Sequence, residues 1–372
     1  MPALAAIAGV LLLATVLWDA FETVVLPRRV NRRLRLTGLF YRATWAPFAR
    51  SAARFKTVNR REAYLSLYGP LSLVLLLALW AGGLVIAFAL LHYGAGSAVA
   101  MSKERSGLLL DFYMSGSTFF TLGLGDVAPI AWPSRALTIV EAGMGFGFLA
   151  LVIGYFPVTY QAFSARETNI SLLDARAGSP PSAGELLRRH RGEGGLRALE
   201  EVLHEWEHWA AELLETHLSY SMLAYFRSQH SNQSWIAALT TILDASALLI
   251  AGAEGAIARQ ARLTFAIARH AVVDLAQVFS TPPQASPADR LPAAVLARLR
   301  ADLEAAGLPL APGPEVEVRL ADLRRMYEPY AIALSRHLLQ PLPEWHYETR
   351  RRDNWQTSAW DKTSSAWMDE HF

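Results

Sequence analysis

The distribution of apolar residues predicts three membrane-spanning helices in the first half of the chain. Residues 3–18 carry no charge, and continuing this run to Leu26 makes about 36 Å of helix at ~1.5 Å per residue, enough to cross a bilayer. Residues 65–93 contain no formally charged side chain and end in His92 and Tyr93, which suit the membrane interface. A third apolar run covers residues 136–156 and contains one acid, Glu141.

After residue 165 the apolar positions recur at helical spacing, and no strand pattern stands out. The periodicity predicts helices over 185–230, 233–279, 294–306 and 316–340, after a linker at 178–181. Within the second of these, residues 235–257 approach the length of a span, but Asp244 and Glu254 interrupt the apolar run. The buried core of a soluble unit explains this stretch better than a fourth span does.

Composition supports a membrane protein, because only 18% of the residues are charged, whereas a soluble globular protein carries about a quarter. Disulfides, thiolate metal sites and cysteine nucleophiles are excluded because the chain has no cysteine. A secretory signal is a weaker interpretation of the first apolar run, since no basic segment precedes it and no small-residue cleavage site follows it.

The basic residues between the first two runs predict the orientation in the membrane. Residues 28–61 contain no acid, and their basic residues are Arg28, Arg29, Arg32, Arg33, Arg35, Arg42, Arg50, Arg54, Lys56, Arg60 and Arg61. Such a loop stays in the cytoplasm next to anionic lipid head groups. A nucleic-acid partner is not expected, because the net charge is only +2 and apolar spans flank the basic run. We therefore expect a multi-pass protein of the cytoplasmic membrane with its N-terminus outside and its C-terminal region in the cytoplasm.

The segment 108–129, LLLDFYMSGSTFFTLGLGDVAP, lies between the second and third predicted spans. A polar loop at membrane depth is stable only where protein surrounds it or water lines it. Gly123 and Gly125 can adopt positive φ in alternation with Leu122 and Leu124, which would turn successive carbonyl groups toward one axis. A simple glycine-rich turn is the alternative, and a phosphate-binding loop would need a lysine and a following helix, which are absent.

The sequence Thr121-Leu122-Gly123-Leu124-Gly125-Asp126 resembles the selectivity filter of the potassium-channel family, TVGYG followed by Asp. The resemblance implies an all-α pore-loop channel with an outer helix, a re-entrant pore helix over 109–120, a filter and an inner helix. It also implies a homotetramer whose carbonyl groups at 121–125 replace the hydration shell of K⁺, with no other cofactor.

The resulting division of the chain is an N-terminal membrane helix (1–27), a basic cytoplasmic linker (28–62) and a channel domain (63–164). A helical cytoplasmic domain (165–340) and a tryptophan-rich tail (341–372) follow. Trp345, Trp355, Trp360 and Trp367 lie in that tail. Docking of the tail onto a neighbouring subunit or the membrane, and disorder, are both open alternatives. The helical domain shows no ligand-binding motif, and its gating signal is unknown.

Two positions depart from the family pattern. Leu124 replaces the usual tyrosine, and Ser117 stands where the family often has a carboxylate, which leaves Asp126 without its usual acidic partner. A weakly selective monovalent cation channel is therefore the alternative function. Glu141 is an ionisable group at membrane depth, so we expect it to support the filter together with Asp126 and Ser117, as a protonatable partner of Ser115 or Ser117.

Glycines on the inner helix predict either a gating hinge or close helix packing. Gly143, Gly145, Gly147 and Gly154 each lower helix stability by about 1 kcal/mol relative to alanine. The resemblance implies a hinge near Gly145, and Pro157 would kink the cytoplasmic end of the helix. Small residues that let helices approach closely are the alternative explanation.

Residues 204–208, His-Glu-Trp-Glu-His, match the zinc-protease pattern in which His204 and His208 bind metal. A membrane-bound zinc peptidase is thus a distant alternative function, and a regulatory metal site could also use His217 or Glu212. No third histidine follows at the spacing of related proteases, so a solvated helix face explains the match better. We expect no enzymatic activity.

Overall fold

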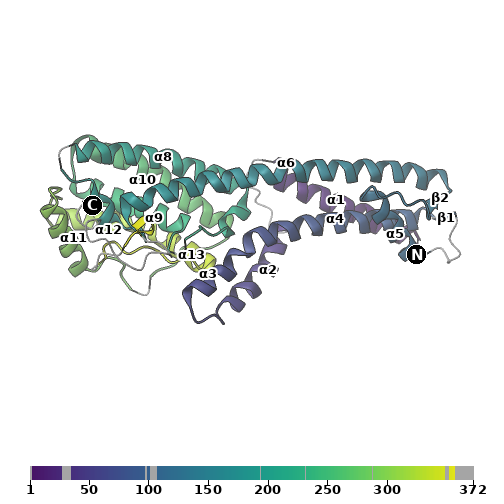
Figure 1. Ribbon diagram of the computed structural model, residues 1–372, viewed down its shortest axis with the longest axis horizontal. Coiled ribbons are helices and arrows are strands. Elements are labelled where there is room, and N and C mark those ends of the chain that lie inside the picture. The colour runs from purple at the N-terminus through teal and green to yellow at the C-terminus, as the bar shows by residue number, and fades with distance from the viewer. Residues whose placement is uncertain are drawn as a thin grey trace. The chain divides into compact units, whose positions relative to one another are not determined.

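The computed structural model describes residues 2–26, 35–96, 99–100, 107–192, 194–230, 232–286, 288–347 and 352–356. These residues form two compact units: residues 1–54 with 67–161, and residues 55–66 with 162–372. Helices make up nearly all regular structure in the described part (Figure 1). The predicted all-α fold is therefore confirmed, and the boundary between the units near residue 161 lies close to the predicted end of the channel domain at 164.

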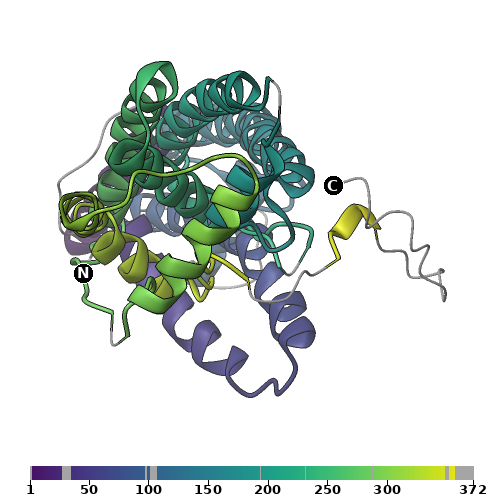
Figure 2. The same ribbon diagram turned by 90° about the vertical axis from the view of Figure 1, so that its left-hand side faces the viewer.

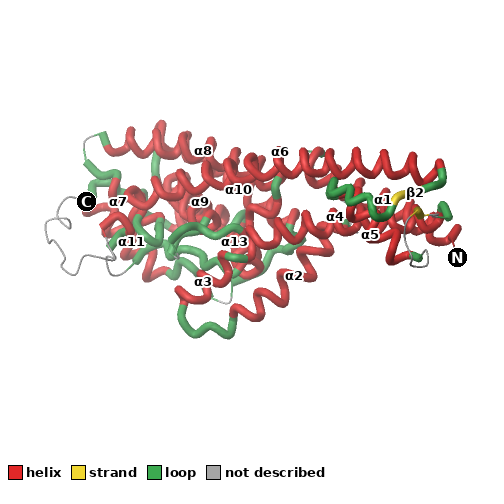
Figure 3. Tube along the Cα trace, turned by 45° about the vertical axis from the view of Figure 1, so that its right-hand side comes forward, coloured by secondary structure: helices red, strands yellow, loops and turns green. Residues whose placement is uncertain are grey.

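The first unit contains the predicted spans. Its helices are α1 (Pro2–Ala20) with the π-helical turn η1 (Phe21–Val25), α2 (Leu36–Ala52), α4 (Tyr68–Gly94), α5 (Leu108–Phe119) and the first part of α6 (Trp132–Ala177). Two short strands, β1 (Val99–Ala100) and β2 (Ala128–Pro129), pair antiparallel and appear in yellow in Figure 3. Part of the segment expected to be a basic linker is thus helical, and Arg28, Arg29, Arg32 and Arg33 lie outside the described residues.

Small residues bring α1 and α4 together as a closely packed antiparallel pair. A Cβ atom at Gly94 would lie 2.6 Å from Cβ of Ala6, and one at Gly9 would lie 2.8 Å from the carbonyl oxygen of Ala87. Such distances leave no room for a side chain. The glycines therefore permit the backbone contact between the two helices, as they do between helices in membranes generally.

A buried carboxylate connects α1, α2 and α4. Asp19 accepts hydrogen bonds from Nε1 of Trp80 (3.0 Å) and from both the backbone N–H (3.1 Å) and the hydroxyl (2.6 Å) of Thr37. Thr37 lies in the first turn of α2, where backbone N–H groups have no partner within the helix. Asp19 therefore caps α2 from another helix and satisfies the buried Trp80 indole.

The second unit is a helical bundle built from α3 (Val58–Ser66), the end of α6 and the helices that follow. These are α7 (Ala183–Arg189), α8 (Gly195–Ser219), η2 (Ser221–Tyr225), α9 (Trp235–Gly252), α10 (Gly255–Val278), α11 (Ala293–Ala305), α12 (Pro314–Arg325), α13 (Glu328–Leu338) and η3 (Asn354–Gln356). In Figure 2 the long teal and green helices of this unit are seen nearly end-on, whereas shorter light-green helices cross the view.

Three of the long helices predicted from periodicity are divided in the structure. Gly192 (φ 86°) and Gly194 (φ 81°) adopt left-handed conformations between α7 and α8, and Gly255 (φ 77°) does so as the first residue of α10. Pro329 lies in the first turn of α13, where its missing N–H ends the helix predicted over 316–340.

Helix α9 is the core of the second unit. Every residue of α9 is buried, and the helix packs against α7, α10, α12 and α13. Helices α8 and α10 run antiparallel: Gln260 donates to Glu207 (2.7 Å), and Thr264 donates to the carbonyl oxygen of Leu203 (2.9 Å). A helix that is apolar all round is buried all round in a globular unit.

By length and composition, four helices in the described part could cross a membrane: residues 2–25, 58–94, 132–177 and 235–252. The last of these is α9, and the complete burial of its residues by protein agrees with its interpretation as a core helix.

Asp244 on α9 organises a buried charge network. Arg290 donates to Asp244 (2.7 Å) and to Glu328 (2.9 Å), and the hydroxyl of Tyr327 also donates to Asp244. Burial alone would lower the pKa of Arg290, but the charge of Asp244 raises it above its usual value. The guanidinium also lies 5.7 Å from the ring of Trp345, which is fully buried. The first tryptophan of the tail therefore packs within its own unit, whereas Trp360 and Trp367 lie outside the described residues.

Candidate functional site: the pore loop

Helix α5 ends where the predicted filter begins, and the backbone makes the transition. The carbonyl oxygen of Ser117 accepts hydrogen bonds from the N–H groups of Leu122 (2.8 Å) and Gly123 (3.4 Å). One carbonyl in the last turn of α5 thus holds two residues of the loop. Ser117 contributes through its backbone, and the contact expected between its side chain and Glu141 is not formed.

The loop backbone has the alternation that the glycine pattern predicts. Gly123 (φ 57°) and Gly125 (φ 79°) are left-handed. A Cβ atom at either glycine would meet no atom within 4 Å in the described chain, so the backbone conformation, and not lack of space, requires glycine here. Thr121 is also left-handed (φ 58°), which the sequence did not predict and which is uncommon for a β-branched residue.

A single chain leaves this loop uncovered. The side chains of Leu122 and Leu124 are 63% and 61% exposed, and all residues from Thr121 to Asp126 are exposed. Helix α6 is likewise open over its apolar length, with Ile139 72% and Phe146 69% exposed. Apolar side chains of this size gather on surfaces that contact lipid or another protein chain.

Asp126 has a partner that the sequence analysis missed. The hydroxyl of Tyr113 on α5 donates to Oδ2 of Asp126 across 2.8 Å. Tyr113 lies four residues before Ser117, one helical turn away on the same face of the pore helix, and this spacing is the signal that could have identified it. A phenol from the pore helix, one turn before Ser117, therefore provides the hydrogen-bond partner of Asp126.

Glu141 joins the three helices of the pore module in the interior. It is completely buried on α6 and lies 3.1 Å from Nε2 of His92 on α4, and the hydroxyl of Ser115 on α5 donates to its other oxygen. Of the two serines predicted as partners, Ser115 makes the contact. His92 is fully buried by protein, and its position at the membrane interface stays a prediction.

Gly145 is a packing residue between the inner helix and the pore helix. A Cβ atom there would lie 2.0 Å from the carbonyl oxygen of Phe119, whereas one at Gly143, Gly147 or Gly154 would meet nothing within 4 Å. The packing explanation therefore holds for Gly145, and a hinge at this position stays a prediction. Helix α6 continues through Pro157 to Ala177 as one element.

The histidine pair of α8 lies apart from the pore loop, in the second unit. The rings of His204 and His208 meet edge to face with centroids 4.8 Å apart, and Glu205 pairs with Arg176 (2.6 Å). His217 is buried, with Nε2 3.3 Å from Arg166 and Nδ1 3.3 Å or less from oxygen atoms of its own helix. Within the described residues, no group of three or more His, Asp or Glu side chains is arranged to hold a metal ion.

An outer helix, a re-entrant helix, a glycine-containing loop and an inner helix follow one another in the first unit, which is the architecture of a pore-loop ion channel. Residues 74–161 match the family model described as "Ion channel". The predicted resemblance is thereby confirmed for this part of the chain. The protein is a multi-pass membrane protein with a helical module of the pore-loop channel type. The match does not extend to the second unit. No curated protein and no solved structure matches the chain.

Proposed function

We propose that four copies of this chain form a potassium-selective pore around a central axis. The observation that carries the proposal is the loop backbone, in which Gly123 and Gly125 adopt the left-handed conformation within the stretch matched by the ion-channel family. Alternation of this kind lets successive carbonyl oxygens point to one side, where they can replace the water around a dehydrating cation.

The exposed loop supports assembly of several chains. One chain contributes one pore loop, and a ring of carbonyl groups needs copies related by a rotation axis. The exposure of Leu122, Leu124 and Phe146 provides apolar surface that neighbouring copies and lipid would cover. Four copies would enclose the loops in protein, as a polar loop at membrane depth requires.

Selectivity for potassium is supported by the unchanged number of carbonyl groups between residues 121 and 125. Leu124 removes the tyrosine hydroxyl of the family pattern, but the Tyr113–Asp126 hydrogen bond provides another connection between the pore helix and the end of the loop. If carbonyl number and dipole strength set selectivity, the channel prefers K⁺ strongly. The weakly selective cation channel remains the outcome expected if the missing hydroxyl dominates.

Gating by the helical second unit is supported by the continuity of α6, which runs from Trp132 to Ala177 and has residues in both units. The basic segment 28–61 would lie at the cytoplasmic head groups, with Arg50, Arg54 and Lys56 exposed in its described part. This orientation puts the N-terminus outside and the second unit in the cytoplasm.

A flux assay on purified protein in liposomes tests the proposal. Potassium influx blocked by barium, with much slower sodium influx, is expected for the parent protein, and both Gly123→Ala and Gly125→Ala should abolish it while the protein stays folded. Equal potassium and sodium flux would establish the weakly selective channel instead. Conduction by either alanine variant at the parent rate would show that residues 121–125 are not the filter.

A further inference from the structure

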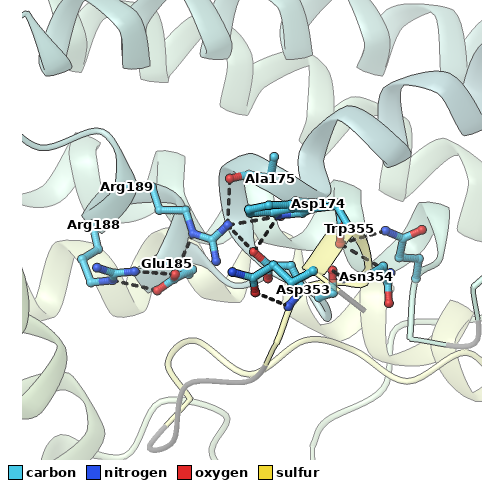
Figure 4. Close-up of polar contacts among 11 residues, drawn as sticks. Asp174, Ala175, Glu185, Arg188, Arg189, Asp353, Asn354 and Trp355 are labelled. Carbon is cyan, nitrogen blue, oxygen red and sulfur yellow. Dashed lines mark hydrogen bonds and ion pairs between the residues drawn. The ribbon is translucent and has the colours of Figure 1, made fainter. Parts of the chain in front are cut away.

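Residues 352–356, with the sequence Arg-Asp-Asn-Trp-Gln, dock on the end of α6 in the second unit (Figure 4). Their central contact is made by Asp353, whose side chain is only 2% exposed. A carboxylate in a short polar segment is seldom buried unless a cation receives it. The segment therefore binds at a site that is expected to provide a cation for this carboxylate.

Arg189 on α7 is the cation of this site. Its Nη1 donates to Oδ2 of Asp353 (2.7 Å) and to the carbonyl oxygen of Ala175 (2.7 Å), and its Nε donates to Glu185 (2.6 Å). Ala175 lies in the last turn of α6, where carbonyl groups lack helical partners and carry partial negative charge. Figure 4 shows Arg189 between the helix end, Glu185 and Asp353.

Side-chain amides recognise the next residue of the segment. Asn354 and Asn232 exchange two hydrogen bonds (3.0 and 3.1 Å), and Nδ2 of Asn354 also reaches Oδ1 of Asp174 (3.4 Å). The backbone N–H of Asn354 donates to the hydroxyl of Ser179 (3.2 Å). The contacts come from α6, from the turn after it and from the loop before α9, so the site offers partners to both residues of the Asp-Asn pair.

Two features favour reversible docking. Oδ1 of Asp353 is buried and has no hydrogen-bond partner among the described residues, so the desolvation of this carboxylate is only partly compensated. Arg189 keeps Glu185 as its partner if the segment leaves, so an empty site holds no unpaired cation. The charge of Arg189 is therefore compensated both when the segment is docked and when it is released.

We propose that the end of α6 carries a reversible recognition site for an Asp-Asn peptide segment, occupied by Asp353 and Asn354 of the same chain. Occupancy links the last turn of α6 to α7 and to the loop before α9. If the chain conducts as proposed above, α6 is the inner helix of the pore, and release of the segment alters channel opening. That regulatory consequence rests on the proposed function, whereas the docking itself does not.

Neighbouring arginines provide the test and its matched control. Arg188 and Arg189 both bind Glu185, but of the two only Arg189 donates to Asp353. In the full-length protein, trypsin should cleave the bond after Arg352 about tenfold faster in Arg189→Gln than in the parent, because cleavage follows the population of the released segment. Arg188→Gln should match the parent. Equal rates in both variants would overturn the docking site.

A second variant tests the docking site independently, in case Arg189→Gln does not fold. Asn232→Ala removes the amide contacts to Asn354 without touching the ion pair, and it should also speed this cleavage while the thermal unfolding midpoint stays near that of the parent. Cleavage at the parent rate in this folded variant would contradict recognition of Asn354.

Cross-linking of two introduced cysteines shows whether the docked segment belongs to the same chain. The chain contains no cysteine of its own that would interfere. With Ser179→Cys and Arg352→Cys, which leave the side chains of Asp353 and Asn354 in place, a short bis-maleimide should give a cross-link within one chain. Cross-linked dimers would overturn the same-chain assignment in favour of a neighbouring copy, and absence of any product would contradict docking.

In planar bilayers, the open probability of Arg189→Gln should differ from that of Arg188→Gln. If the two variants gate alike while trypsin distinguishes them, docking stands and the regulatory consequence is wrong. If the parent itself does not conduct, the proposed function fails, and the cleavage rates still decide the docking.

Discussion

The hydroxyl of Tyr113 donates to Asp126 across 2.8 Å and so connects the pore helix to the residue that follows the glycine-containing loop. The two residues flank the segment 121–125 in the chain: Tyr113 precedes it in α5, and Asp126 follows it directly. Their hydrogen bond therefore connects the two sides of the loop. This connection is formed by the chain itself, whatever the number of copies in the assembly.

Tyr113→Phe should weaken discrimination between potassium and sodium, because it removes this hydrogen bond and leaves the ring. Reversal potentials under a potassium-to-sodium gradient measure the effect, and a severalfold drop in the permeability ratio is expected. Asp126→Asn should act in the same direction, and the double variant should be no worse than the more affected single variant, as expected for two partners of one interaction. Additive losses would mean that the two residues act separately.

Gly145→Ala should destabilise the first unit, because its Cβ would collide with the backbone carbonyl of Phe119 at 2.0 Å. Overpacking of this kind costs about 1–3 kcal/mol. Thermal unfolding in detergent measures it. Gly147→Ala is the matched control, because its Cβ meets nothing within 4 Å and alanine favours the helix by up to ~1 kcal/mol. A Gly145→Ala protein as stable as Gly147→Ala would contradict the close contact.

Glu141→Ala should cost about 1–3 kcal/mol of stability, because removing it leaves buried polar groups without their hydrogen-bond partner. His92 and Ser115 would both lose their contact with the inner helix. Glu141→Gln keeps a hydrogen-bonding group of similar size and should lose less. Chemical unfolding followed by tryptophan fluorescence ranks the variants, and equal stability of the alanine and glutamine variants would contradict a specific role of the polar contacts.

Glu185 should make the second unit more stable above pH 4.5 than in acid. Burial alone would raise the pKa of Glu185, but hydrogen bonds from Arg188 and Arg189 lower it from 4.5 to about 2. A group whose pKa falls on folding stabilises the folded state above its unfolded pKa and loses that effect as the pH falls through the folded value. The shift corresponds to about 3 kcal/mol. The difference in unfolding free energy between the parent and Glu185→Gln should therefore shrink as the pH falls from about 4.5 to 2.

The amino-acid sequence alone determined the apolar spans, the helical class and the glycine pattern of the pore loop. These features depend on local chemistry: runs of uncharged residues long enough to cross a bilayer, 3.6-residue periodicity, and glycine at positions that need positive φ. The observed bounds of α4 and α5 accordingly lie within a few residues of the predicted ones.

The partners of individual polar groups were decided only by the tertiary structure. His92 and Glu141 are 49 residues apart, and Arg189 and Asp353 are 164 apart, so no local spacing relates them. In each pair, burial makes an unpartnered polar group costly, and packing determines which distant side chain compensates it. Tyr113 and Gly145 follow the same rule, because their roles depend on Asp126 and on the carbonyl of Phe119, which only the folded chain brings within reach.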